Sequence, residues 1–139
     1  PKYSLHTNQF IIMSKQNKII YWASTGFLSL GMLAGGVQQM LQIGGYNEIV
    51  TKLGYPLYLL TILGVWKILG VIAILIPKFQ LLKEWAYAGF AFDFIFASIS
   101  HFAVDGIGFQ GFFPLIVFAI LIVSYVTYHR IHRYKNIAL

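Results

Sequence analysis

The sequence predicts an all-α membrane protein: a four-transmembrane-helix antiparallel bundle with both termini cytoplasmic. Its 139 residues contain four long apolar stretches, at about 19–43, 55–76, 82–103 and 112–129. Each has about 18–25 residues, which a helix rising 1.5 Å per residue needs to cross a hydrocarbon core of about 30 Å. The chain is also 58% hydrophobic and only 10% charged, whereas an average soluble domain has about 25% charged residues.

The links between the stretches are short and contain turn-forming residues. Residues 44–54 and 104–111 each hold three glycines, and residues 77–81 begin with a proline. Short links join antiparallel neighbours, so an up-down-up-down order of helices is the simplest topology. We therefore expect residues 19–129 to form a single four-helix membrane domain.

Basic residues indicate the orientation of these spans. They cluster before the first stretch, between the second and third, and after the fourth, at Lys15, Lys18, Lys78, Lys83, Arg130, Arg133 and Lys135. The other two links together hold only Lys52. Because cytoplasmic loops are enriched in lysine and arginine, we expect a multi-pass protein of the inner (cytoplasmic) membrane, with links 44–54 and 104–111 outside. The net charge of +6 is then explained by the orientation of the spans. We therefore expect a lipid bilayer, and no nucleic acid, as partner.

The segments outside the spans are short. Residues 1–18 form an N-terminal cytoplasmic lead, in which Met13 opens a stretch typical of a start site, so we expect residues 1–12 to be additional upstream sequence. Residues 130–139 form a basic cytoplasmic tail. A basic tail of this kind is suited to contact with anionic lipid.

Two opposite charges lie inside the predicted spans. Lys67 is in the middle of the second stretch and Asp93 in the middle of the third, at similar depth. An isolated charge at the bilayer centre costs roughly 2.5–3.5 kcal/mol on insertion scales, so we expect both to face inward and pair. The pair has two interpretations. It is either functional, as a proton relay or a counter-ion for a ligand, or structural, as a bond that only sets helix register.

A polar stripe leads outward from this pair. In the third stretch Asp93, Ser100 and His101 share a helical face, and Asp105 follows one turn later. In the first, Gln38 and Gln42 are four residues apart. These side chains form either a polar vestibule that leads down to the ion pair, or hydrogen-bonding contacts that hold helices together.

Several kinds of chemistry find no support. The chain has no cysteine, which excludes disulfides, thiolate-bound zinc and cysteine-ligated clusters. It has no catalytic motif and no metal site, so we assign no catalytic residue and predict a non-enzymatic protein. No motif implies a cofactor, although a quinone or other lipophile is compatible with the polar face.

Gly31 and Gly35 form a GxxxG pattern, which favours a homodimer, a larger membrane complex or packing within the bundle.

Residues 55–101 resemble the DoxX-like family of small four-span bacterial membrane proteins. The likeness rests on LGVWKILG, which contains Lys67, on LIPKF, and on LKEWAYAGFAFD, which ends at Asp93. It extends more weakly over about 19–127 and implies the four-span fold. The family's namesakes are subunits of a thiosulfate:quinone oxidoreductase, and a broader likeness reaches proteins that assist membrane-protein assembly.

Two functions follow as hypotheses. The first is an accessory membrane protein, or a bundle that binds a small lipophilic ligand beside the midplane pair of Lys67 and Asp93. The alternative, which the resemblance raises, is a membrane subunit of a quinone-linked redox system. No quinone site is carried over residue by residue.

Overall fold

The computed structural model describes residues 2–137, which form five helices joined by short links and contain no strand. This confirms the predicted all-α fold class. The helices are α1 (Lys2–Met40), α2 (Tyr46–Lys52), α3 (Tyr58–Leu75), α4 (Gln80–Asp105) and α5 (Phe109–Ile137). All except α2 are long and apolar enough to cross a membrane, so the four predicted spans correspond to α1, α3, α4 and α5.

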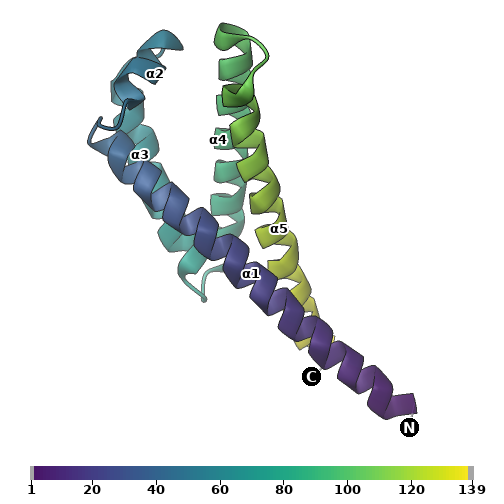
Figure 1. The fold of residues 1–139 in the computed structure, drawn as a ribbon. Coiled ribbons are helices and arrows are strands. Elements are labelled where there is room, and N and C mark those ends of the chain that lie inside the picture. Colours follow the sequence, from purple (N-terminus) through teal and green to yellow (C-terminus); the bar gives the residue numbers. More distant parts are fainter. Residues whose placement is uncertain (1, 138–139) are drawn as a thin grey trace.

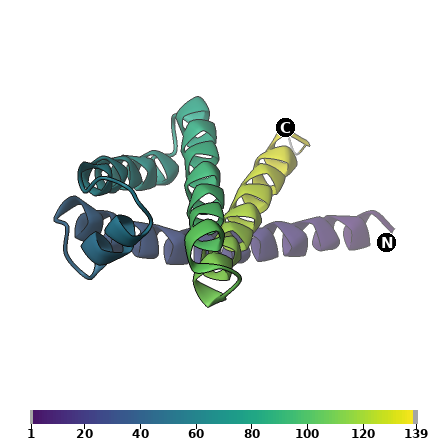
Figure 2. The same cartoon turned by 90° about the horizontal axis from the view of Figure 1, so that it is seen from above.

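The four long helices form an open bundle. In Figure 1, α1 and α3 make one arm, α4 and α5 make the other, and α1 runs obliquely so that it also packs against α5. Both termini lie at one end, which we call the terminal end. The short helix α2 and the α4–α5 turn lie at the other, which we call the link end. Figure 2 shows from above that α3 and α5 lie on opposite sides of α4.

Backbone conformation explains where the helices end. Gln42 takes a left-handed conformation (φ 56°), and the amide of Ile43 donates to the carbonyl of Gln38 at 2.9 Å. This is a Schellman-type C-terminal cap, which stops α1 at Met40 although the apolar stretch continues to residue 43. Gln42 therefore lies outside the helix, and Gln38 and Gln42 do not share the expected helical face.

The closest helix contact is the α1–α3 crossing at Gly36 and Gly64. A Cβ atom built on Gly64 lies 2.5 Å from the carbonyl oxygen of Gly36 and 2.5 Å from the amide nitrogen of Met40. The two backbones therefore touch, which only glycine at position 64 permits. Gly31 has no heavy atom within 4 Å of its Cβ position, so the GxxxG pattern does not make this contact.

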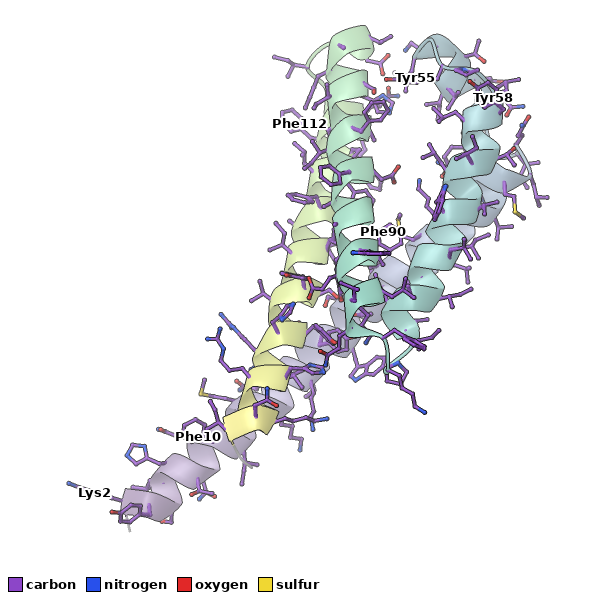
Figure 3. The ribbon with its side chains drawn as sticks, turned by 180° about the vertical axis from the view of Figure 1, so that it is seen from behind. Lys2, Phe10, Tyr55, Tyr58, Phe90 and Phe112 are labelled. Carbon is purple, nitrogen blue, oxygen red and sulfur yellow. The ribbon has the colours of Figure 1, made fainter. Side chains whose placement is uncertain are left out.

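Aromatic rings fill the other helix contacts. Phe90 of α4 packs over Gly70 of α3 (Figure 3), where a Cβ on the glycine would lie 2.6 Å from the ring. Phe102 of α4 covers Gly111 of α5 in the same way. A glycine facing a large ring lets two helices approach while the contact stays filled.

Apolar side chains lie both inside and outside the bundle. The buried core cluster consists of Leu28, Met32, Val71, Ile74, Tyr87, Phe90, Phe94 and Leu121. Many other large apolar side chains are exposed on the outer surface, including Trp22, Leu30, Trp66, Phe92 and Ile99. Such a surface is favourable in lipid and costly in water, so the chain is an integral membrane protein.

The α1–α3 crossing generates a first prediction. Gly64→Ala should lower the melting temperature in detergent strongly, because the new methyl group overlaps two backbone atoms and overpacking costs about 1–3 kcal/mol. Gly31→Ala is the matched control and should be neutral or mildly stabilising, since its methyl group meets no neighbour and alanine favours helix. Equal melting temperatures for the two variants would contradict the close crossing.

Candidate functional site

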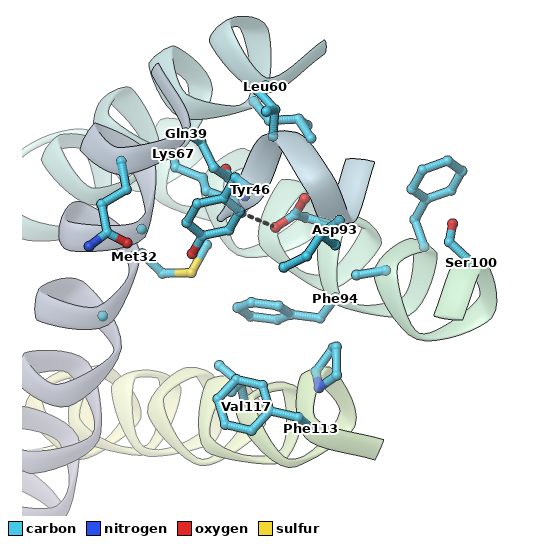
Figure 4. A pocket seen from close by; sticks show the side chains of 18 of the residues that line it. Met32, Gln39, Tyr46, Leu60, Lys67, Asp93, Phe94, Ser100, Phe113 and Val117 are labelled. Carbon is cyan, nitrogen blue, oxygen red and sulfur yellow. Dashed lines mark ion pairs between the residues drawn. The ribbon is translucent and has the colours of Figure 1, made fainter. Parts of the chain in front are cut away.

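A cavity of about 540 Å³ lies between the two arms toward the link end. All five helices contribute to its wall, and most of the wall is apolar, with Leu28, Met32, Leu63, Phe94, Phe113 and Val117 among its residues. Its size falls within the range of about 300–1,000 Å³ that is typical of small-molecule sites. Figure 4 shows the cavity at close range.

Lys67 and Asp93 lie in the wall of this cavity and form an ion pair. The Lys67 ammonium is 3.2 Å from Oδ2 of Asp93, and the side chains are only 14% and 17% exposed. Lys67 follows Gly64 by one helical turn, and its Cβ would be 3.1 Å from a Cβ on Gly36. The tight α1–α3 crossing thus sets the position of the lysine. The pair joins α3 to α4 across the opening between the arms.

Two polar residues outside the predicted vestibule accompany the pair. Gln39 of α1 is buried and lines the cavity, and within residues 2–137 its Oε1 has no hydrogen-bond partner. Tyr46 opens α2 and lies beside Lys67 and Asp93 in Figure 4. Burial, and then the negative charge of Asp93, raise the pKa of the Tyr46 hydroxyl. This hydroxyl lies 3.4 Å from the Cβ position of Gly35 on α1.

The predicted vestibule residues divide into two groups. Gln38, Ser100 and His101 line the cavity, and Ser100 shares a hydrogen bond of 2.9 Å with the Tyr55 hydroxyl. Gln42 instead turns to α3, where its amide donates at 3.3 Å to the hydroxyl of Thr61. The structure therefore brings three of the five predicted residues together around the cavity.

The fifth predicted residue, Asp105, belongs to the rim at the link end. Its carboxylate contacts His101 Nδ1 at 2.8 Å and the Lys52 ammonium at 2.6 Å. Lys52 is the last residue of α2, and glycines with positive φ flank this helix at Gly45 and Gly54. Two polar contacts, this ion pair and the Tyr55–Ser100 bond, thus fasten the α2 segment to α4 beside the cavity.

Toward the terminal end the bundle is closed. The apolar core lies below the ion pair, and below it Ser124 shares hydrogen bonds with Thr25 at 2.6 Å and with Tyr87 at 2.7 Å. In the described residues this hydroxyl cluster makes no hydrogen bond or ion pair with Lys67 or Asp93.

A second polar cluster ties α4 to α5 at the terminal end. Glu84 contacts His129 Nε2 at 2.6 Å and accepts a hydrogen bond from Tyr125 at 2.9 Å. The buried Lys83 ammonium lies 4.7 Å from the centre of the Tyr128 ring, a cation–π contact. The sequence offered a signal here, because Lys83 and Glu84 belong to the LKEWAYAGFAFD segment.

Comparison with known protein families gives a match. The profile of the DoxX-like family matches residues 23–124. This chain belongs to the DoxX-like family. The match contains the glycine crossing, the ion pair and every residue that lines the cavity of this DoxX-like protein. No curated protein and no solved structure matches the chain.

The arrangement is suited to binding a small molecule. Within residues 2–137 no group of three or more His, Cys, Asp or Glu side chains is placed to hold a metal ion. Apolar walls with a few convergent polar groups are typical of sites for small lipophilic molecules. The cavity of this DoxX-like protein can therefore hold an apolar body, with a polar group directed at the ion pair.

Breaking the ion pair should destabilise the protein. Lys67→Met and Asp93→Asn should each cost about 3 kcal/mol, because each leaves a partner uncompensated in an apolar wall. The double variant should regain most of this loss, and Lys78→Met, in the exposed α3–α4 link, should change little. Thermal unfolding in detergent micelles measures these effects. Single variants as stable as the parent would contradict a pair that matters to folding.

Proposed function

We propose that this DoxX-like protein is a non-enzymatic membrane protein that binds a small lipophilic molecule in the cavity between its two arms. The observation that carries the proposal is the combination of an apolar cavity of about 540 Å³ with one ion pair in its wall. If the ion pair only set the register of the helices, it would not need a cavity beside it. An ion pair that orients a ligand needs such a cavity.

The position of the cavity in the bundle supports the same function. The cavity lies toward the link end, while the apolar core and the hydroxyl cluster close the terminal end. A transporter needs access from both sides in turn, whereas a binding protein needs one entrance. With the lysines and arginines as orientation signal, we place the termini in the cytoplasm and the cavity in the outer half of a bacterial inner membrane.

The bound molecule is the main test. The protein is purified in mild detergent without added ligand, and the extracted lipids are identified by mass spectrometry. We expect one non-phospholipid lipophile in near-stoichiometric amount. An extract with only bulk phospholipid, together with an unchanged melting temperature across a panel of quinones and other lipophiles, would refute ligand binding.

Filling the cavity should abolish this binding without harming the fold. Gly31 lines the cavity and has no heavy atom within 4 Å of its Cβ position, so Gly31→Leu places an isobutyl group in the ligand's space. Gly26→Leu is the matched control, because Gly26 has equally open surroundings on α1 but is absent from the cavity wall. The extract of Gly31→Leu should lose the lipophile while that of Gly26→Leu keeps it. Loss in both variants would contradict the assigned position.

The same extract addresses the alternative, a membrane subunit of a quinone-linked redox system. Aromatic side chains such as Phe94 and Phe113 in the cavity wall favour a ring-containing ligand. A stoichiometric quinone in the extract would support that role. We also propose that the protein forms a homodimer or belongs to a larger membrane complex. Native mass spectrometry of the unheated sample would detect either assembly by its mass.

A further inference from the structure

Four polar side chains of the cavity lie together on one side of it. Figure 4 shows Gln39, Tyr46, Lys67 and Asp93 close together, with Phe94, Phe113 and Val117 across the cavity from them. Gln39 comes from α1, Tyr46 from α2, Lys67 from α3 and Asp93 from α4. We call these four residues the polar wall. Because four separate helices contribute one residue each, the polar wall exists only in the folded bundle.

The polar wall has hydrogen-bonding capacity that the protein does not use. An ammonium group has three N–H donors and a carboxylate has about four acceptor positions. Within residues 2–137 the side chains of Lys67 and Asp93 contact only each other, and the Tyr46 hydroxyl has no hydrogen-bond partner. Gln39 adds an amide oxygen that is buried without a partner. Unmet polar groups in an apolar site each cost about 1–3 kcal/mol, so a ligand that meets them gains affinity.

The net charge of the polar wall limits which head groups a ligand can have. Lys67 and Asp93 neutralise each other, and Gln39 and Tyr46 are uncharged at neutral pH, so the polar wall has no net charge. A carboxylate or phosphate head would bring an unmatched charge into this wall. A pure hydrocarbon would leave the donors and acceptors of the wall unmet. A neutral head that both donates and accepts a hydrogen bond avoids both costs.

We propose that the ligand is a neutral, hydroxyl-bearing lipophile whose O–H group lies against the polar wall of Gln39, Tyr46, Lys67 and Asp93. This inference rests on the proposed function and specifies the ligand class. The apolar body of the ligand lies among the aromatic and aliphatic side chains across the cavity. The hydroxyl oxygen of the ligand accepts a hydrogen bond from Lys67, and its O–H donates one to Asp93.

The test compares three probes that share one apolar body: 4-octylphenol, its methyl ether 4-octylanisole, and 4-octylbenzoic acid. Each is titrated against the full chain in detergent, and bound protein is counted by native mass spectrometry. The phenol should bind about tenfold more tightly than the ether, since the ether lacks the donor that the wall requires. The acid at neutral pH should bind more weakly than either.

Conservative variants connect this preference to the polar wall. Tyr46→Phe removes one hydroxyl group from the wall, and Gln39→Leu replaces a buried unmet amide, so both should fold and both should narrow the ratio of phenol to ether affinity. Tyr58→Phe is the matched control, because Tyr58 is 67% exposed and lies outside the cavity wall. Its ratio should equal that of the parent.

The outcomes separate this inference from the proposed function. Equal affinity for the phenol and the ether, or tighter binding of the acid, would overturn the hydroxyl assignment while leaving a lipophile-binding cavity in place. An unchanged ratio in both Tyr46→Phe and Gln39→Leu would overturn the role of the polar wall. Failure of all three probes to bind, with an extract free of any lipophile, would instead refute the proposed function.

Discussion

The ion pair between Lys67 and Asp93 joins the two arms of the bundle near the middle of α3 and of α4, two helices long and apolar enough to cross a membrane. Neither residue is stable alone in that position, so each requires the other, and the requirement holds α3 near α4 across a cavity. The close contact of Gly36 with Gly64 then determines how far α3 and its lysine stand from α1. The shape of the cavity follows from these two constraints.

An open bundle in lipid differs physically from an open bundle in water. Apolar helices gain little from packing against each other in a membrane, because lipid tails are as apolar as their side chains. Specific contacts such as glycine crossings, ring-on-glycine packing and buried hydroxyl pairs must therefore hold the helices. Here they join α1 to α3 at Gly36 and Gly64 and α4 to α5 at Phe102 and Gly111, and the cavity lies between the two arms.

The similar depth of Lys67 and Asp93 is predictable by counting residues along two apolar stretches. The positions of Gln38, Ser100 and His101 on the outer half of the bundle follow from the same counting. Gln42 is different, because the left-handed cap that ends α1 was not visible in an apolar stretch that runs on to residue 43. Hydropathy reports where lipid is favourable and does not report where a helix stops.

Composition and hydropathy by themselves determined that this chain is helical and lives in a membrane, because lipid tolerates no unpaired backbone and few charges. The sequence also determined that two buried charges must meet. Only the tertiary structure decided that a cavity adjoins them and that Gln39 and Tyr46 complete its polar wall. The four residues of the polar wall come from four helices. Their proximity depends on how the helices cross and tilt, which the periodicity of a sequence does not encode.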